Sequence, residues 1–548
     1  MSEAREETHA GSGDVFTTET AGLAEVGRPS VVRLRDGDTF GLRIGAVRNR
    51  IDGDVLRMLA YNGSIPGPTL HVEQGAEITV EVINDGDVEA TVHWHGLRLE
   101  NRYDGVPHET QAPIPIGGTY ACKVQFPDAG CYWYHPHVRE DYGLEMGLYG
   151  TIVVEPADAS YWPPVDRQLT ITLDDLLVED GHVAPFLRSG PTYTAMGRFG
   201  NVMLTNGQTM YSADAALNEV VRLYVVNTAN TRIFNVAVRG ARMKLVGGDS
   251  GRYERETIVE EVLLSPSERA IIDVLFDTAG EIHLEHRTPD RIYHLGTFTV
   301  HGATSGATGG AAASFDSLRV DPELSAARQS LDHDLQRPPD KTLAFFSRMP
   351  LLYGTGDVAA AMYMCPMHPD VTAAEAGTCP RCGMKLVPSD TPPARDTQPQ
   401  AGTAHTGHDH ADGLEWEDLM PEINRASDPG NMIWQLIDRE TGAENGAITW
   451  AFTVGDRVKI RLVNEMESDH PMHHPFHIHG AGRFLILARD DRPEANLVWK
   501  DTVLVRAGQT VDILLDVSNP GLWMAHCHIA EHAQSGMMFS FDVARQPT

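Results

Sequence analysis

The sequence has no apolar run long enough to cross a bilayer, few cysteines for its length and a deficit of positive charge. Its 44 basic and 76 acidic side chains give a net charge of −32, which disfavours nucleic acid as a partner, because a nucleic-acid-binding face is basic. The acidic surface favours cationic substrates, including metal ions, or serves solubility alone. At 548 residues the chain is too long for one hydrophobic core, and we predict three or four domains.

Neither an export signal nor a disulfide framework is evident. Residues 1–29 lack the apolar stretch of a secretory signal, so as the sequence stands we expect a cytoplasmic location. We also expect a monomer with no membrane span. A periplasmic or extracellular location follows if an export segment is missing from this start. The six cysteines are not spaced as a disulfide framework. Cys122 and Cys131 flank an expected hairpin turn at 127–130, in a register that disfavours a bond between them.

Short runs rich in Val, Ile, Thr and Leu dominate the chain, and helical periodicity is weak. Runs such as 77–84, 222–227 and 457–464, bounded by Gly, Pro, Asn or Asp, are typical of β-sandwich strands. We therefore predict an all-β protein of three sandwich domains with a small insertion between the second and third. The expected segments are an N-terminal extension 1–29, sandwiches at 30–157, 165–302 and 412–545, linkers at 303–360 and 389–411, and a cysteine-containing insertion at 361–388.

Four histidine pairs carry the functional argument. They are His93 with His95, His135 with His137, His477 with His479, and His526 with His528. Side chains on a strand alternate between faces, so both members of a pair point the same way. Imidazole is a good copper ligand, and four converging strands would offer eight nitrogens to a multi-copper cluster. One pair arises by chance in a chain with 25 histidines, but four do not.

Cys527 stands between the members of the last pair and therefore faces the opposite way, toward a second site. His474 and His532 can join it there, with Met537 as a long axial ligand. Two His, one Cys and a weak Met form the arrangement of a blue-copper electron-transfer site, and this combination has no common zinc counterpart. The two sites would be linked through one residue on either side of Cys527, which suits electron transfer between them.

These four motifs, in this order, resemble those of the multicopper oxidases, the family of laccases, cuprous oxidases and ferroxidases. The resemblance implies three cupredoxin-like domains, the second without a ligand motif, and four copper ions. The type 1 site would use His474, Cys527, His532 and Met537, the type 2 site His93 and His477, and the type 3 pair His95, His135, His137, His479, His526 and His528. It also implies one-electron oxidation of a small-molecule or metal-ion reductant near the type 1 histidines, coupled to four-electron reduction of dioxygen to water.

Proton supply is predicted only in part. Asp104 matches the family's acidic residue near the type 2 copper; a turn aspartate before Gly105 is the alternative. Many bacterial relatives place a glutamate directly after the second type 1 histidine, where this chain has Ala533. Glu531 is not equivalent, so the proton route beside the type 3 pair is not fixed by the sequence.

The insertion carries a second kind of metal motif. Cys365 and His368, followed by Cys379 and Cys382, have the spacing of one tetrahedral soft-metal site, and the glycine after Cys382 suits a tight turn. The segment resembles the heavy-metal-binding domain of copper-transporting ATPases and metal efflux proteins. It implies a further soft metal, copper or zinc, that is sensed or delivered; a purely structural zinc knuckle is the alternative.

The next linker contains His405, His408 and His410, for which a solvated linker is favoured over a loose metal site.

Three functions stay open at this point. Laccase-like oxidation of phenols leads. A metallo-oxidase for Cu(I), Fe(II) or Mn(II) in copper homeostasis is favoured by the acidic charge and the insertion, but not by the 19 scattered methionines. A copper-resistance protein that sequesters metal without turnover belongs to a different class. A copper nitrite reductase is disfavoured, because it lacks a type 3 pair.

Overall fold

The computed structural model describes residues 15–302, 310–353, 363–388 without residues 367, 369, 376 and 382, and 412–546. Three β-sandwiches follow one another along the chain. Alternation of buried and exposed side chains builds them: on β5 (Glu77–Asp85), Ile78, Val80 and Val82 are buried, and Glu81 between them is exposed. The all-β prediction is confirmed.

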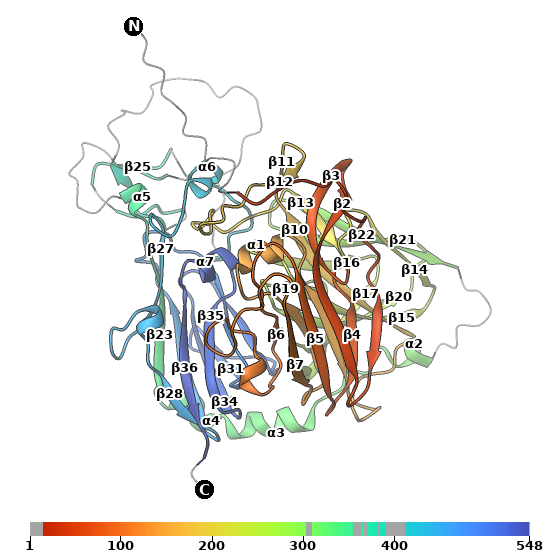
Figure 1. Cartoon of the computed structure of the whole chain (residues 1–548). Coiled ribbons are helices and arrows are strands. Elements are labelled where there is room, and N and C mark those ends of the chain that lie inside the picture. Colours follow the sequence, from red (N-terminus) through yellow and green to blue (C-terminus); the bar gives the residue numbers. More distant parts are fainter. Residues whose placement is uncertain are drawn as a thin grey trace.

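The first sandwich (red to orange in Figure 1) pairs a five-stranded sheet with a four-stranded one. The first sheet has the order β1 (Val31–Leu34), β4 (Thr69–Glu73), β9 (Gly150–Glu155), β8 (Gly130–His135), β6 (His93–His95), and the second β3 (Asp54–Tyr61), β2 (Thr39–Ile51), β5, β7 (Thr119–Gln125). The hairpin expected around 127–130 does not form, because β7 pairs with β5 while β8 pairs with β6 and β9. Cys122 and Cys131 are both buried and free.

The second sandwich has a six-stranded and a five-stranded sheet. Their orders are β13 (Val202–Thr205), β10 (Arg167–Leu176), β15 (Glu219–Asn227), β20 (Arg269–Phe276), β17 (Arg242–Gly248), β18 (Gly251–Val259), and β14 (Tyr211–Ala216), β22 (Ile292–His301), β21 (Gly280–Arg287), β16 (Phe234–Arg239), β19 (Val262–Leu264). A short hairpin of β11 (Val178–Glu179) and β12 (His182–Val183) adjoins it.

The third sandwich (blue in Figure 1) packs against the first. Its sheets run β27 (Ile433–Asp438), β23 (Lys341–Arg348), β29 (Arg457–Asn464), β34 (Thr510–Val517), β31 (Gly482–Arg489), β32 (Arg492–Pro493), and β28 (Ala451–Thr453), β36 (Met538–Ala544), β35 (Gly521–Cys527), β30 (His474–Ile478), β33 (Thr502–Val505). Helices α1 (Glu140–Glu145) and α7 (Ala530–Gln534) meet between the two sandwiches.

The segment 303–360 differs from the predicted linker. It contains α2 (Gly310–Ser314), α3 (Pro322–Ser330), α4 (Asp332–Gln336), α5 (Pro350–Tyr353) and strand β23. The side chain of Asp321 caps α3 by accepting a hydrogen bond from the backbone N–H of Leu324, 2.8 Å away. Strand β23 buries Leu343 and Phe345 between β27 and β29. The third sandwich therefore begins some 70 residues before the predicted start at 412, and the insertion interrupts it.

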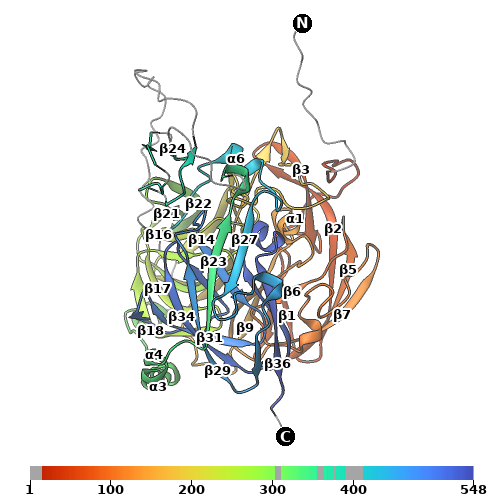
Figure 2. The same ribbon diagram turned by 90° about the vertical axis from the view of Figure 1, so that its left-hand side faces the viewer.

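The insertion forms a three-stranded sheet of β25 (Thr372–Ala373), β24 (Tyr363–Met364) and β26 (Val387–Pro388). It lies at the same end of the molecule as α6 (Pro421–Arg425) in both Figure 1 and Figure 2. Residues 389–411, with His405, His408 and His410, lie outside the described residues. In the described part of the chain, no helix has the length and apolarity needed to span a bilayer.

Candidate metal centres

The four histidine pairs come from two pairs of neighbouring strands. In the first sandwich His93 on β6 lies opposite His135 on β8, and in the third His477 on β30 lies opposite His526 on β35. The second member of each pair is two residues along, at or just beyond its strand. Since these strands meet where the two sandwiches pack, all eight imidazoles converge on one buried volume, and each is at most 3% exposed.

The eight imidazoles fall into three groups whose ligand atoms lie within 4.8 Å of one another. The groups are His95, His135 and His528; His137, His479 and His526; and His93, His95 and His477. Among the described residues, at least one ring nitrogen in most of these imidazoles is buried without a hydrogen-bond partner, namely His93 Nε2, His95 Nδ1, His135 Nε2, His137 Nε2, His477 Nε2 and both nitrogens of His528. Buried polar atoms are normally paired, so this donor set fits metal ions that complete it.

The other nitrogen of several rings is fixed by the backbone. His93 Nδ1 donates to the carbonyl of Asp104 at 2.7 Å, and His477 Nδ1 to that of Asp501 at 2.9 Å. His526 Nδ1 donates to the carbonyl of Cys527 at 2.8 Å. Such bonds set the tautomer and orientation of a ligand ring, leaving the opposite nitrogen to face the metal.

Asp104 lies between the two sandwiches at the cluster. It is fully buried, its Oδ2 accepts a hydrogen bond from His479 Nδ1 at 2.7 Å, and its Oδ1 lies 3.4 Å from His93 Nδ1. Burial by itself would raise the pKa of Asp104, but the imidazoles of His479 and His93 outweigh it and lower that pKa. The position next to the predicted type 2 ligand His93 is the one that the resemblance implied.

A second buried carboxylate, Glu140, was missed from the sequence. Its Oε1 lies 3.1 Å from His135 Nδ1 and 3.7 Å from His528 Nε2, and the side chain is fully buried. Glu140 is the first residue of α1, three residues after His137. An acidic residue at a helix start, directly after a His-x-His motif, was the signal available.

Ala533 occupies the position directly after His532, where an acid was expected. Ala533 is buried on α7, and Glu531 on the same helix points to the second sandwich, accepting hydrogen bonds from Asn230 Nδ2 at 3.0 Å and Thr231 Oγ1 at 3.2 Å. Burial raises the pKa of Glu531 to about 7. The carboxylate beside the imidazole cluster comes instead from Glu140, in the facing helix α1.

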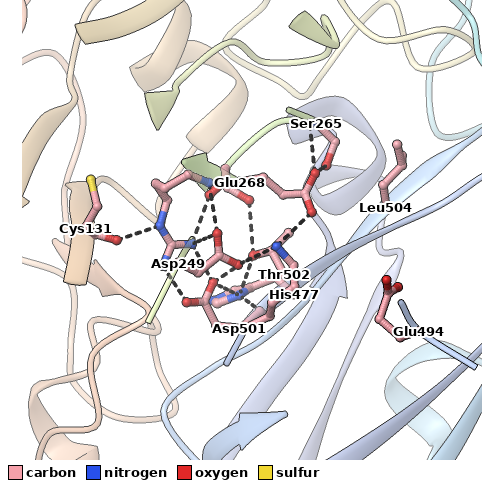
Figure 3. A network of polar contacts seen from close by, with 12 residues as sticks. Cys131, Asp249, Ser265, Glu268, His477, Glu494, Asp501, Thr502 and Leu504 are labelled. Atoms are coloured by element: carbon pink, nitrogen blue, oxygen red, sulfur yellow. Dashed lines mark hydrogen bonds and ion pairs between the residues drawn. The ribbon is translucent and has the colours of Figure 1, made fainter. Parts of the chain in front are cut away.

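The second sandwich has no ligand motif but supports the cluster through a buried ion network (Figure 3). Asp501 Oδ1 lies 3.0 Å from His95 Nε2, and it accepts a hydrogen bond at 2.7 Å from Arg269 on β20. Lys500 continues the network to Asp249 at 3.0 Å and to Glu268 at 3.1 Å. A buried ion pair of this kind holds its partners in one geometry, so Arg269 fixes the carboxylate that orients His95.

The predicted mononuclear site also comes together. Cys527 Sγ lies 3.4 Å from His474 Nδ1 and 3.8 Å from His532 Nδ1, and it accepts a long hydrogen bond from the backbone N–H of Ile529 at 3.5 Å. Burial raises the pKa of the Cys527 thiol, so a bound cation is needed to hold the thiolate. Met537 is fully buried in the same apolar cluster, and its carbonyl accepts a hydrogen bond from the Cys527 backbone.

Aromatic rings cover the two histidines of this site. The ring of Trp434 on β27 lies 4.0 Å from that of His532 and 5.0 Å from that of His474, while Phe345 on β23 lies 5.3 Å from His474, centre to centre. His474 is 1% exposed and His532 is fully buried. The sequence suggested that a reductant docks at these edges; the structure places Trp434 and Phe345 over them.

Several of the methionines that are scattered in the sequence are buried in the apolar core of the third sandwich. Seven buried methionines belong to one apolar cluster with Cys527 and Trp434, namely Met196, Met349, Met384, Met420, Met432, Met472 and Met537. Thioethers pack well in irregular cores and are soft ligands for Cu(I). The scatter of methionines along the sequence is therefore no argument against a metal-ion substrate.

The insertion brings three of its four predicted ligands together. His368 Nδ1 lies 3.6 Å from Cys365 Sγ and 3.4 Å from Cys379 Sγ, and all three side chains are buried. Gly383 adopts a positive φ of 75°, and its N–H donates to the carbonyl of Cys379 at 2.9 Å, as in a tight metal-binding turn. Cys382 lies outside the described residues.

Comparisons with known sequences agree with this arrangement. Models described as multicopper oxidase match residues 44–159 and 420–547, and a heavy metal binding domain model matches residues 362–389. The copper resistance protein A homolog of Pseudomonas syringae pv. tomato is 25% identical over 91% of each chain. The multicopper oxidase MmcO of Mycobacterium tuberculosis is 26% identical and covers 97% of this chain and 91% of its own. Laccase-21 of rice is 24% identical over 89% of this chain and 88% of its own.

Solved structures share the fold. A multicopper oxidase from Campylobacter jejuni, described as a metallo-oxidase, superposes with a TM-score of 0.62 at 20% identity, over 97% of this chain and 99% of its own. The laccase-like multicopper oxidase CueO of Ochrobactrum sp. gives a TM-score of 0.65 at 20% identity, over 95% of this chain and all of its own. The predicted fold class, family and cofactor are confirmed. The chain belongs to the multicopper oxidase family, whose members bind four copper ions and pass electrons to dioxygen, and it carries a heavy-metal-binding domain within its third cupredoxin sandwich.

Proposed function

We propose the following division of ligands among the copper ions. The type 2 ion is held by His93 and His477, and the type 1 ion by His474, Cys527, His532 and Met537. One ion of the type 3 pair is held by His95, His135 and His528, the other by His137, His479 and His526. The three-residue groups within 4.8 Å and the unpaired ring nitrogens support this division.

The observation that carries the proposal is the position of Cys527 between two cluster histidines. Its Sγ faces His474 and His532, while the rings of His526 and His528 face the imidazole cluster. When bound, the copper ions supply one-electron chemistry at the type 1 site and four-electron reduction of dioxygen at the cluster. The protein supplies the covalent link between the two sites.

Two carboxylates are suited by position to supply protons to the cluster. Asp104 contacts His479 and His93, and Glu140 contacts His135 and His528, so each serves a different part of the cluster. Reduction of dioxygen to two waters takes up four protons, and both carboxylates lie next to ligand rings, where they can pass protons to the cluster. We assign Asp104 to the side where the type 2 ligand His93 adjoins the type 3 ligand His479, and Glu140 to the side of the type 3 ligands His135 and His528.

Replacing Cys527 with Ser tests the assignment. The variant is expected to lose the blue thiolate-to-copper absorption and oxygen uptake with any reductant, because the serine hydroxyl is not a soft ligand and does not replace the thiolate. Cys122→Ser is the matched control, since Cys122 is a buried free thiol on β7 that touches none of the metal groups. Oxidase activity that survives in Cys527→Ser contradicts the type 1 assignment.

The reductant is either a phenol, as in laccases, or a metal ion. The buried edges of His474 and His532 and the metal motif of the insertion favour a metal ion. Turnover on 2,6-dimethoxyphenol and on Cu(I), followed by oxygen uptake, separates the two. A protein that binds copper but consumes no oxygen with either reductant would instead be a sequestering resistance protein.

A further inference from the structure

The heavy-metal-binding insertion lies in the chain between the two strands that cover the type 1 histidines. It lies in the segment between β23 and β27, together with α5 and α6, and these two strands pair so that Ser347 lies opposite Trp434. Phe345 on β23 packs on His474, and Trp434 on β27 packs on His532. The segment that contains the insertion therefore follows one of the two strands that cover the type 1 histidines and precedes the other.

Specific contacts dock the insertion on the loop that leads into His474. Lys385 Nζ forms an ion pair with Asp469 Oδ1 at 2.5 Å. Tyr353 Oη donates to the carbonyl of Lys385 at 2.7 Å and approaches that of Asp469 at 3.3 Å. Asp469 precedes His474 by five residues, so this latch, Lys385–Asp469–Tyr353, ties the insertion to a type 1 ligand through a short stretch of chain.

Gly383, in the tight turn of the insertion, packs against the same loop. A Cβ at this position would come within 2.5 Å of Met466 Cε and 3.4 Å of Pro471 Cγ. The side chains of Cys365, Cys379 and Met384 also belong to the buried apolar cluster that contains Cys527. The two metal sites therefore border the same apolar core of the third sandwich.

A cavity gives ions a route to the insertion. It has a volume of about 990 Å³, and Cys379, Arg381, Met466 and Pro471 line it together with residues of the second and third sandwiches. Cys379 is only 2% exposed, and this cavity reaches it. The cavity wall carries five acidic side chains, Glu268, Asp412, Glu415, Asp490 and Glu494, and five basic ones, Arg269, Arg381, Arg489, Lys500 and Arg506.

We propose that the insertion is the site where a Cu(I) substrate is held while it donates its electron to the type 1 site. Cu(I) enters through the cavity, is bound by Cys365, His368 and Cys379, and loses one electron to the oxidised type 1 site. Thiolates select Cu(I), and the harder Cu(II) formed is a poorer match and leaves. Four such electrons, four protons and one dioxygen give two waters. This inference rests on the proposed oxidase function.

The competing role is a structural zinc knuckle. Zinc has no redox chemistry, so a zinc ion in the insertion cannot donate an electron and would block the site for Cu(I). The two roles therefore predict opposite effects of zinc on Cu(I) oxidation. A structural role predicts equal or faster Cu(I) oxidation with zinc bound, whereas the proposed role predicts inhibition.

The test follows the blue absorption of the four-copper holoenzyme without oxygen. One equivalent of Cu(I) is mixed with the wild type, Cys379→Ser and Lys385→Met, and the rate of bleaching is compared with that produced by 2,6-dimethoxyphenol. The ratio of the Cu(I) rate to the phenol rate is expected to fall about tenfold or more in Cys379→Ser. In Lys385→Met it falls several-fold, because the docked geometry is loosened.

Lys341→Met is the matched control for the latch. Lys341 on β23 forms an ion pair with Glu440 at 2.8 Å in the same sandwich, and neither residue touches the insertion. This variant should keep the wild-type ratio. X-ray absorption at the copper edge should show sulfur coordination of the added Cu(I) in the wild type and less in Cys379→Ser. Zinc added to the wild-type holoenzyme before Cu(I) should lower the ratio as Cys379→Ser does.

The outcomes separate the two proposals. A wild type that is bleached by the phenol but not by Cu(I), or a ratio unchanged by both zinc and Cys379→Ser, overturns the role of the insertion and leaves the oxidase assignment intact. A blue protein that neither reductant bleaches overturns both proposals.

Discussion

The carboxylate of Asp104, from the first sandwich, accepts a hydrogen bond of 2.7 Å from His479 in the third sandwich. The two residues are 375 positions apart in the chain. This contact therefore does two things at once: it orients a ring that we assign to the type 3 pair, and it joins the two sandwiches whose histidines converge on one cluster.

Asp104→Asn should slow the reduction of dioxygen while leaving the type 1 site intact. The amide keeps the shape but supplies no carboxylate, and loss of a positioned acid–base group typically costs a factor of about 100 or more. Stopped-flow measurement of the fully reduced enzyme mixed with oxygen gives the rate. Asp85→Asn, which alters an exposed ion pair with Arg43, is the control. Loss of the blue absorption in Asp104→Asn would show that the residue is needed for assembly instead.

Glu140→Gln should impair the same step from the type 3 side. The carboxylate of Glu140 faces His135 and His528, so reoxidation of the reduced enzyme by oxygen should slow by about 10- to 100-fold. Reduction of the type 1 site by substrate should be unaffected. Glu145→Gln is the control, because Glu145 lies on the same helix but accepts a hydrogen bond from the backbone N–H of Leu177. This variant should be reoxidised at the wild-type rate. Equal rates in the two variants would remove Glu140 from the proton route.

Arg269→Met should destabilise the protein and loosen the cluster. The change leaves Asp501 as a buried carboxylate without its guanidinium, which costs about 3–5 kcal/mol of unfolding free energy. Urea unfolding of the copper-free protein measures this cost. Arg48→Met breaks an exposed ion pair with Glu25 and should cost about 1 kcal/mol or less. If Arg269→Met lowers the unfolding free energy by less than Arg48→Met does, Asp501 finds another partner in the variant.

Trp434→Leu should open the type 1 site to organic reductants. The indole lies 4.0 Å from the ring of His532, and a smaller side chain uncovers that edge, so kcat/KM for 2,6-dimethoxyphenol should rise several-fold. Trp450→Leu is the control, because Trp450 is also buried in the third sandwich but packs on Phe539. An unchanged value in Trp434→Leu would show that phenols reach the site by another path.

The candidate ligand residues could be selected from the sequence because the direction in which their side chains point is governed by local geometry. Strand alternation alone separates Cys527 from His526 and His528, and the structure brings these residues to the two groups expected for them. Period-two patterning needs no knowledge of the tertiary fold, so these predictions depend only on the strands themselves.

Other residues could not be found this way, because their roles depend on which elements pack together. Glu140 reaches the cluster only since α1 faces α7, and Arg269 only since the second sandwich lies against β33. Trp434 lies over His532 on β27, a strand that pairs with β23 in space although the insertion separates the two strands in the sequence. The linker prediction for 303–360 failed for a different reason: its Gly- and Ala-rich start concealed the strand that follows.

The shared cluster also makes copper loading a late event in folding. Half of its imidazoles come from the first sandwich and half from the third, so none of the three-residue groups is complete until the most distant parts of the chain have met. Contacts of such long sequence separation form slowly. Copper bound there acts as a clamp on the finished assembly, and its removal by a chelator should lower the cooperativity with which the sandwiches unfold.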